Sequence, residues 1–543
     1  MESRMNLPRR SLLAFTSAGM LARRAVAAPL VPVHIAIPEP LAIELPSRTA
    51  TLSPLQPPLR DLLSAATCPG RRVTFDLAHP VGAGPVRVTW TARGGDAAGG
   101  PPATQSAVLF VLPTGSTPVG LSGDENATGG NNASRIARDS AGQVHMVWLD
   151  GGRPGVGIGV MYRRASTLPD GSVHWETPPI RIEEPAEQTW NGYVGLAVSE
   201  RAVHIAWQSG ATARYRRLSY GPGGWTFGPV RDLAARSDGR DVGPAIAARG
   251  QTVHIATPEG IDIVSEDGGD TWARAQIPVP AGQKMKSVTV ALDSLGNAHF
   301  AFTGIVHGPE NPSSGHPSSG YWELRYVRRS VGGKWVDAQD ALAGRPEWAR
   351  ASNDDDVLAD WPCLAIDDHD AIHLGWHGSA RSRMYGHDQS YYMYRPTIGP
   401  GAWQDHWTKP VALMPTGSAP GVRFSFAPSL ALDGTIAVPV TFYDIYDGTR
   451  WAGFDSAARV IRDGQLVGSP VPVAHWVSDS VAARQPEAAL GSRFSAAAPR
   501  IYHAPDGRLW LDVLETLMPM GVPGAPDLIV YQRVDVTRAV RAA

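Results

Sequence analysis

The chain has 543 residues, with 43% hydrophobic and 18% charged side chains, a composition that supplies a large core and excludes an intrinsically disordered protein. Its formal net charge of −2 gives no reason, on net charge alone, to expect a nucleic-acid-binding surface. The two cysteines, Cys68 and Cys363, are too few for a disulfide scaffold and form no Cys-x-x-Cys pair. We favour two separate buried thiols over one disulfide, because free cysteine behaves as a small apolar residue.

Residues 1–27 have the order of an export signal. Arg9-Arg10 precede an apolar run over 11–22, and Ala25-Val26-Ala27 form a small-residue cleavage site. Twin arginines beside a modest apolar run are typical of twin-arginine export. The run is too short to span the roughly 30 Å hydrocarbon core of a membrane. We therefore expect a soluble mature chain that starts near Ala28 and is periplasmic or secreted.

Residues 28–122 contain strand-like runs without a repeat, separated by segments rich in Pro and Gly. The runs are Val31–Ile37, Val73–Leu77, Val86–Thr91 and Val108–Leu112. They predict a small β-rich module or an extended lead-in, whose end pairs with the last repeat. The stretch Gly123–Asn132 is expected to lead into the first repeat.

From residue 134 a pattern recurs: a short apolar strand, an Asp/Gly turn, then a strand of the form His-apolar-x-apolar. Many copies continue with an aromatic-basic third strand and a fourth strand that carries a tryptophan. Such repeats are typical of four-stranded propeller blades. We predict an all-β chain in which residues 123–543 form a β-propeller of seven blades, or six if the first and last copies share a blade. The copies contain His145, His204, His254, His299 and His373, with degenerate copies at 433–440 and 506–513.

One turn is more specific than the repeat. Ser265–Trp272 reads S-x-D-x-G-x-T-W, a complete Asp-box, and it occurs once. The repeat, this motif and the export signal together resemble the sialidase superfamily of Asp-box (BNR) propellers. In that superfamily the Asp-box is a structural turn between the outer strands, so the resemblance implies fold rather than chemistry.

The repeated histidines are interpreted as part of the blade architecture, because five copies occupy one strand position. The loops that follow the second strands differ between blades and are better candidates for a ligand site. The fifth loop is the richest, with His377, Arg381, Arg383, Tyr385, His387 and Tyr392. Other loops and their neighbours contribute Glu259, His307, His316, Arg423, Tyr443, Asp444 and Arg450.

These residue types suit an acidic sugar. Arginine binds carboxylates through two hydrogen bonds, and histidine or tyrosine transfers protons when the environment tunes its pKa. β-Elimination beside a uronate needs this combination, because neutralising the carboxylate acidifies the neighbouring C–H. Hydrolysis would more usually need two carboxylates, and four acidic residues follow second strands: Asp150, Glu259, Asp444 and Glu515.

The fifth repeat, 370–377 followed by Tyr392-Met393-Tyr394-Arg395, also resembles BNR propellers that are polysaccharide lyases. The resemblance implies proton transfer by His377, His387 and Tyr385 or Tyr392, with Arg381 or Arg383 on the substrate carboxylate. Arg135-Ile136-Ala137 echoes only weakly the R-I-P-like motif of true sialidases, which argues against sialic acid as the substrate.

The leading hypothesis is an exported lyase that acts on an acidic polysaccharide. The alternatives are a glycoside hydrolase of sialidase-like fold and a glycan-binding propeller without catalysis. A glycan is the expected partner; nucleic acid and stable membrane insertion are not expected. No cofactor or metal site is predicted, and a structural Ca²⁺ is left open.

Overall fold

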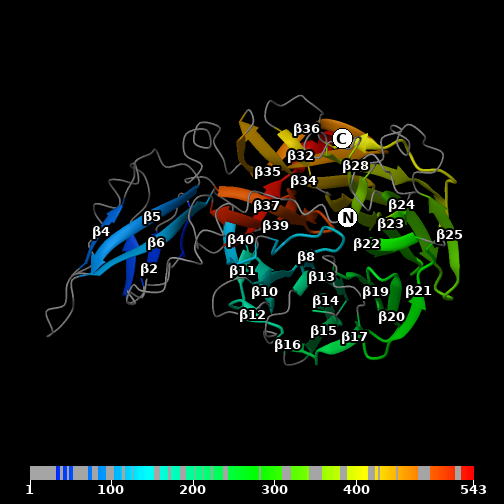
Figure 1. The fold of residues 1–543 in the computed structure, drawn as a ribbon, viewed down its shortest axis with the longest axis horizontal. Helices are drawn as coiled ribbons and strands as arrows, with labels where there is room; N and C mark the ends of the chain where they lie inside the picture. Colours follow the sequence, from blue (N-terminus) through cyan, green and yellow to red (C-terminus); the bar gives the residue numbers. More distant parts are fainter. Residues whose placement is uncertain are drawn as a thin grey trace. The chain divides into compact units, whose positions relative to one another are not determined.

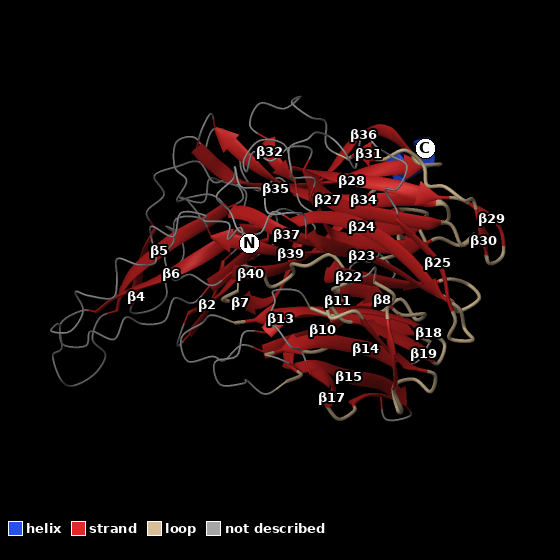
Figure 2. Cartoon of the chain, turned by 45° about the vertical axis from the view of Figure 1, so that its right-hand side comes forward, coloured by secondary structure: helices blue, strands red, loops and turns tan. Residues whose placement is uncertain are grey.

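The computed structural model describes the following residues, and for some strand residues only the backbone: 32–36, 41–45, 48–52, 71–75, 84–92, 103–112, 116–124, 126–151, 159–168, 173–183, 191–200, 202–210, 212–221, 224–235, 243–279, 283–307, 320–340, 358–379, 388–413, 422–425, 428–447, 450–474, 490–519 and 527–543. The predicted export signal, residues 1–27, lies outside these ranges. Figure 1 shows the fold, and Figure 2 shows that strands dominate it.

The chain divides into two compact units, residues 1–81, 86–111 and 307–320 and residues 82–85, 112–306 and 321–543. In the first unit, β1 (Pro32–Ala36), β6 (Ala103–Leu112), β5 (Gly84–Ala92) and β4 (Arg71–Phe75) form a sheet in that order. A separate antiparallel hairpin joins β2 (Leu41–Leu45) to β3 (Arg48–Leu52). This agrees with the β-rich segment expected before the repeats.

The second unit is a seven-bladed β-propeller. Blade 1 consists of β8 (Ile136–Arg138), β9 (Val144–Asp150), β10 (Gly159–Thr167) and β11 (Val173–Trp175), with β12 (Ile180–Arg181) also on β10. Blade 2 consists of β13 (Asn191–Ser199), β14 (Ala202–Ser209), β15 (Thr212–Gly221) and β16 (Gly224–Phe227), with β17 (Arg231–Ala235) on β15. Blade 3 consists of β18 (Ala245–Arg249), β19 (Thr252–Ala256), β20 (Ile261–Ser265) and β21 (Ala273–Gln276).

Blades 4 to 6 are joined by single parallel bridges, Trp322 with Leu358 and Asp388 with Phe424. Blade 4 consists of β22 (Gln283–Leu292), β23 (Ala298–His307), β24 (Gly320–Arg329) and β25 (Trp335–Asp340). Blade 5 consists of β26 (Leu358–Ile366), β27 (Ile372–Ser379), β28 (Asp388–Arg395) and β31 (Val411–Ala412), with the hairpin β29 (Thr397–Gly399) and β30 (Ala402–Trp403). In blade 6, β32 (Val422–Ser425) and β33 (Ser429–Asp433) share the inner position beside β34 (Ile436–Asp447), followed by β35 (Arg450–Arg462) and β36 (Gln465–Ala474).

Blade 7 closes the ring with a strand from before the repeats. It consists of β37 (Leu490–Ala497) and β38 (Tyr502–His503) on β39 (Leu509–Pro519), then β40 (Asp527–Asp535) and β7 (Ser116–Ser122). β7 pairs antiparallel with β40, from Ser122 opposite Asp527 to Ser116 opposite Gln532. The predicted pairing between the lead-in and the last repeat is therefore confirmed, and the count of seven blades holds over six.

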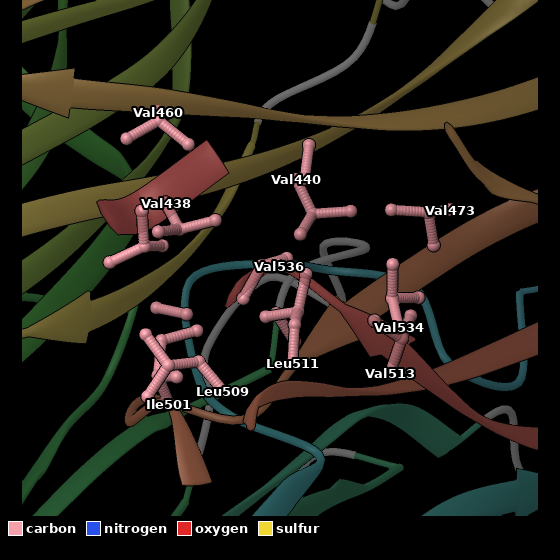
Figure 3. Close-up of a cluster of buried hydrophobic side chains, with 14 of the residues drawn as sticks. Val438, Val440, Val460, Val473, Ile501, Leu509, Leu511, Val513, Val534 and Val536 are labelled. Carbon is pink, nitrogen blue, oxygen red and sulfur yellow. The ribbon is translucent and has the colours of Figure 1, made fainter. Parts of the chain in front are cut away.

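The core lies between the blades. Seven buried clusters each draw side chains from two successive blades, including one between blades 7 and 1. Figure 3 shows the cluster between blades 6 and 7, where Val438, Val440 and Val460 face Leu511 and Val513. The helix α4 (Thr537–Ala542) buries Val540 in the same cluster. The second strands are buried on both faces, which explains their nearly continuous apolar sequences.

Candidate functional site

The repeated histidines link the second strand of a blade to the third. In blades 1, 2, 4 and 5 the histidine Nδ1 lies 2.7–2.8 Å from a tyrosine hydroxyl. In blades 1, 4 and 5 the Nε2 lies 3.1–3.2 Å from the aspartate that opens the turn. The pairs are His145 with Tyr162, His204 with Tyr215, His299 with Tyr326 and His373 with Tyr392. The interpretation of these histidines as blade architecture is therefore confirmed.

The other three blades replace this pair in different ways. In blade 3, Asp262 takes the tyrosine position, binds His254 at 2.9 Å and pairs with Arg329 of blade 4 at 2.6 Å. In blade 7, Asp512 takes the histidine position, accepts a 2.6 Å bond from Tyr531 and pairs with Arg138 of blade 1. In blade 6, buried Val438 takes the histidine position and Ala458, which pairs with Val440, takes the tyrosine position, so both polar partners are absent together. Removing both partners avoids leaving one buried polar group unpaired.

The Asp-box is a hydrogen-bonded turn away from the second-strand loops. Ser265 Oγ donates to Asp267 at 2.8 Å, and Thr271 donates to Asp267 from its hydroxyl at 2.6 Å and its backbone N–H at 2.8 Å. These bonds lower the pKa of Asp267 below its ordinary value. Gly269 has φ +98°, and a Cβ there would lie 2.2 Å from the Tyr215 hydroxyl, so the close packing also requires glycine. The motif's predicted structural role is confirmed.

We call the end of the ring at which each second strand runs into its loop the exit end. His377 lies there near the end of β27, opposite Asp360 on one side and Ser390 on the other. It is 8% exposed. Its imidazole faces the Trp361 indole, with ring centroids 6.2 Å apart and planes tilted by 34°. This places the first residue of the predicted fifth-blade site beside an aromatic surface.

Trp361 is a site residue that the repeat pattern did not reveal. It lies in a bulge of β26, where Asp360 pairs with His377 but Cys363 pairs with Gly375. Its φ is +47°, which costs a bulky side chain about 1–2 kcal/mol. The Trp361-Pro362 dipeptide inside a strand-like run was the available signal, since proline interrupts a sheet ladder.

Tyr392 requires a correction. Its hydroxyl lies 2.7 Å from His373 Nδ1, and its side chain is fully buried. Burial, followed by the influence of Tyr394 and Asp367, raises its pKa well above the ordinary value, so the phenol stays protonated. The structure assigns Tyr392 to the blade pattern and not to the predicted catalytic set.

Most of the other predicted residues are only partly covered by the structure. His307 ends β23, Arg423 lies in β32, Tyr443 and Asp444 lie in β34, and Arg450 begins β35, with their backbones described. Glu259 is half-buried in the turn that follows β19. Arg381, Arg383, Tyr385, His387 and His316 lie outside the described residues.

Two of the carboxylates considered for hydrolysis are buried and already hydrogen-bonded to other side chains of the protein. Asp150 accepts a 3.2 Å bond from Arg181, and Glu515 accepts a 2.7 Å bond from Ser456. Both side chains are almost fully buried. A hydrolytic pair built on these two residues would have to release partners before reaching a substrate.

Arg135 holds the segment that leads into blade 1. Its guanidinium is 1% exposed and donates to the carbonyls of Gly129, Gly130 and Ala133. Desolvation by burial lowers its pKa to about 9. The guanidinium of the arginine that weakly echoes the sialidase motif thus hydrogen-bonds to backbone carbonyls of its own chain.

The segment from Asn126 to Arg135 lines part of the inner wall at the exit end. Thr128 lies 2.8 Å from Thr516 of blade 7, hydroxyl to hydroxyl. Asn132 donates to the carbonyl of Gly243, before blade 3, at 3.1 Å and to that of Val288, in blade 4, at 3.0 Å. These contacts fall on blades 7, 3 and 4, so the segment connects blades that are far apart along the chain.

No group of three or more His, Cys, Asp or Glu side chains that could hold a metal occurs among the described residues. Cys363 is a buried free thiol whose pKa is raised by burial, and Cys68 lies outside the described ranges. Within the described part of the chain, no helix has the length and hydropathy needed to cross a membrane.

No protein-family model matches the sequence, and no curated protein shows a significant match. Among solved structures, a PL25 ulvan lyase bound to a -[GlcA(1-4)Rha3S]- saccharide is similar over 77% of this chain and 95% of its own, with 10% identity and a TM-score of 0.50. The NanB sialidase of Streptococcus pneumoniae covers 84% of each chain, with 10% identity and a TM-score of 0.36. The chain thus has the β-propeller fold of the ulvan lyase, as the blade repeat and the Asp-box predicted.

Proposed function

We propose that the protein is an exported enzyme that cleaves a uronate-containing polysaccharide by β-elimination at the exit end of the propeller. The observation that carries the proposal is the placement of His377 beside Trp361 at the start of the fifth-blade loop. That loop, 380–387, supplies Arg381, Arg383, Tyr385 and His387. The propeller fold shared with a lyase that was solved with a glucuronate-containing saccharide supports the same class of substrate.

The proposed chemistry assigns one task to each residue type. Arg381 or Arg383 pairs with the uronate carboxylate and stabilises the charge that develops there. His377 removes the proton from C5, beside that carboxylate. The electron pair forms the C4=C5 double bond, the C4–O bond breaks, and Tyr385 or His387 gives a proton to the leaving oxygen. No water is consumed.

The test is a screen of uronate-containing and neutral polysaccharides that follows reducing ends and the near-ultraviolet absorbance of the C4=C5 double bond together. We expect both signals on a uronate polymer, and a loss of at least about 100-fold in His377→Ala and Tyr385→Ala. The matched control is His503→Ala, because His503 of blade 7 is an exposed histidine, paired with Asp433 of blade 6. Equal activity of His377→Ala and the control would contradict the proposal.

Hydrolysis is the second candidate, because Glu259 is half-buried in the turn that follows β19 and Asp444 lies near the end of β34. It predicts reducing ends without the absorbance, and loss of activity in Glu259→Gln and Asp444→Asn. Binding without either signal would identify a glycan-binding propeller.

Export through the twin-arginine signal is part of the proposal. We expect the native chain in the periplasm or medium, and the double variant Arg9→Lys, Arg10→Lys in the cytoplasm. Unchanged export of the variant would contradict this route.

A further inference from the structure

A groove lies between the outer strands of blades 2 and 3. It has a volume of about 700 Å³, and its lining residues are Arg231, Asp232, Leu233, Trp272 and Arg274. The first three belong to β17 of blade 2, and the last two lie just before and within β21 of blade 3. Both strands lie at the rim of the ring (Figure 1). We call this site the rim groove; its volume is within the roughly 300–1,000 Å³ of ligand pockets.

Contacts between the two blades hold the walls of the rim groove together. The Arg274 guanidinium of blade 3 donates a hydrogen bond to the backbone carbonyl of Leu233 in blade 2. Trp272 packs edge-on against Tyr215 of β15, with ring centroids 4.8 Å apart. Arg231 pairs with Tyr215 across the sheet, so these two side chains share the face on which Trp272 packs. One indole and two guanidinium groups therefore line the same groove.

The charges of the rim groove favour an anionic ligand. Within the described part of the chain, neither half-buried Arg231 nor exposed Arg274 forms an ion pair with a carboxylate. Asp232, the acidic side chain among the lining residues, pairs with Arg214 at 2.8 Å. Two guanidinium groups thus remain without a counter-charge, and a guanidinium can bind a carboxylate or a sulfate through two hydrogen bonds.

The aromatic side chain favours a sugar as the carrier of that anion. Trp272 is half-buried, and the part of its indole that Tyr215 does not cover lines the groove. Trp272 is also the last residue of the Asp-box, in which Thr271 is bonded twice to Asp267. An indole offers a large apolar surface to the C–H face of a sugar ring, while the arginines bind its acidic group. A uronate or a sulfated sugar has both features.

We propose that the rim groove is a second, non-catalytic binding site for the acidic polysaccharide. The inference rests on the proposed function and extends it: an acidic sugar of the same polymer binds with its carboxylate or sulfate on Arg231 and Arg274 and its ring on Trp272. No bond of the glycan is broken in the groove. Binding at two sites increases the retention of a long chain, whereas an oligosaccharide too short to reach both sites gains nothing.

The test measures binding by affinity electrophoresis with polygalacturonate, dextran sulfate, neutral dextran and polyglutamate as probes. We expect the wild type to bind at least one acidic glycan and not dextran. Arg231→Gln and Arg274→Gln should each weaken that binding about tenfold. On a cleaved polymer both variants should raise KM, with kcat and the kinetics on short oligosaccharides unchanged. The matched control is Arg249→Gln, since Arg249 is exposed at the hairpin between β18 and β19 of blade 3.

Two further variants separate binding from folding. Arg231→Lys keeps the charge but not the planar fork, so it should recover part of the binding. Trp272→Leu removes the aromatic surface and should weaken binding to the acidic glycan, while Trp272→Phe should retain most of it. Thermal unfolding of each variant shows whether the contact with Tyr215 is needed for the fold, and Arg231→Gln should leave the unfolding temperature unchanged.

Groove variants that bind both acidic glycans like the control, or a wild type that binds neither, would overturn the rim groove as a binding site. Stronger binding of polyglutamate than of either glycan would overturn the sugar as its occupant. Unsaturated product together with binding that does not depend on Arg231 or Arg274 would overturn the groove and leave the proposed elimination intact. Binding that depends on both arginines, without any unsaturated product, would do the reverse.

Discussion

At the scale of single residues, the residue type at the repeated histidine position depends on which polar partners the neighbouring residues provide. A histidine with an aspartate at the turn and a tyrosine on the third strand has both ring nitrogens bonded. Burial alone would raise the pKa of Asp367, but the bonds from His373 and from the backbone of Ala371 and His369 lower it. The aspartate, histidine and tyrosine therefore form a buried polar network that fixes the distance between two strands, and this accounts for the repetition of the histidine from blade to blade.

Tyr392 tests this assignment directly. Tyr392→Phe leaves His373 Nδ1 without its buried partner, so we expect a loss of about 1–3 kcal/mol in the free energy of unfolding with unchanged kcat. Tyr326→Phe in blade 4 should cost a similar amount, because its hydroxyl bonds His299 in the same way. Tyr220→Phe, on an exposed side chain, is the control. Chemical denaturation gives the stabilities, and a specific loss of kcat would restore Tyr392 to the catalytic set.

His204 should make stability depend on pH. Burial, with a smaller contribution from Arg217, lowers its pKa from 6.5 to about 4. Between these values the unfolded chain binds more protons than the folded chain, so stability is full above about pH 6.5 and falls by about 3 kcal/mol as the pH drops towards 4. His204→Gln should flatten this slope in denaturation curves recorded across the window. The control is His503→Gln, because His503 is an exposed histidine; equal slopes in the two variants would contradict the assignment.

At the scale of elements, tryptophans beyond the third strands of blades 2 and 5 anchor these blades to the preceding ones. Trp225 of blade 2 donates from its indole to Gln143 of blade 1 at 3.0 Å and packs against His145. Trp403 of blade 5 packs in the same way against His299 of blade 4, with Arg328 stacked 4.7 Å above it. The aromatic-basic third strands and tryptophan-bearing fourth strands seen in the sequence thus serve contacts within and between blades.

Blades 7 and 1 are also joined by side chains, but here the contact is an ion pair. Arg138 and fully buried Asp512 form an ion pair, and the Arg138 guanidinium stacks 4.0 Å above Tyr502. Asp512→Asn should cost about 3–5 kcal/mol, because it leaves a largely buried arginine without its counter-charge. Arg138→Gln should cost a similar amount, and the double variant should cost less than the sum.

The exposed pair between Arg500 and Asp368 is the control for that cycle. Breaking it should cost less than about 1 kcal/mol. Additive losses at Arg138 and Asp512 would show that the two side chains do not stabilise the blade contact together.

At the scale of the whole molecule, the ring is continuous because every pair of neighbouring blades shares a buried cluster. The last of these clusters includes buried Val119 of β7 together with Trp148 of blade 1 and Tyr531 of blade 7. A single strand from before the repeats therefore completes both the sheet of blade 7 and the final interface.

Val119→Asp should open the ring. A buried, unpaired carboxylate at this interface should destabilise the protein by more than about 3 kcal/mol, and loss of the interface should lower the cooperativity of the whole transition. Val331→Asp is the control, because Val331 is exposed. Thermal unfolding followed by near-ultraviolet circular dichroism measures both variants, and a small, local effect of Val119→Asp would show that closure by β7 is dispensable.

The all-β fold, the seven repeats, the architectural role of the histidines and the turn at the Asp-box could all be predicted from the sequence. These features are periodic or depend on residues that are close in sequence. Alternation, turn residues and a repeated strand position therefore reveal them. Which side chains lie against one another became known only from the packing of the strands. Trp361 reaches His377 through a bulge, Tyr392 is taken by His373, and Arg135 is held by backbone carbonyls. Each of these contacts depends on the register and burial of paired strands, and the pattern of residues along one strand does not name the side chain that will lie against it.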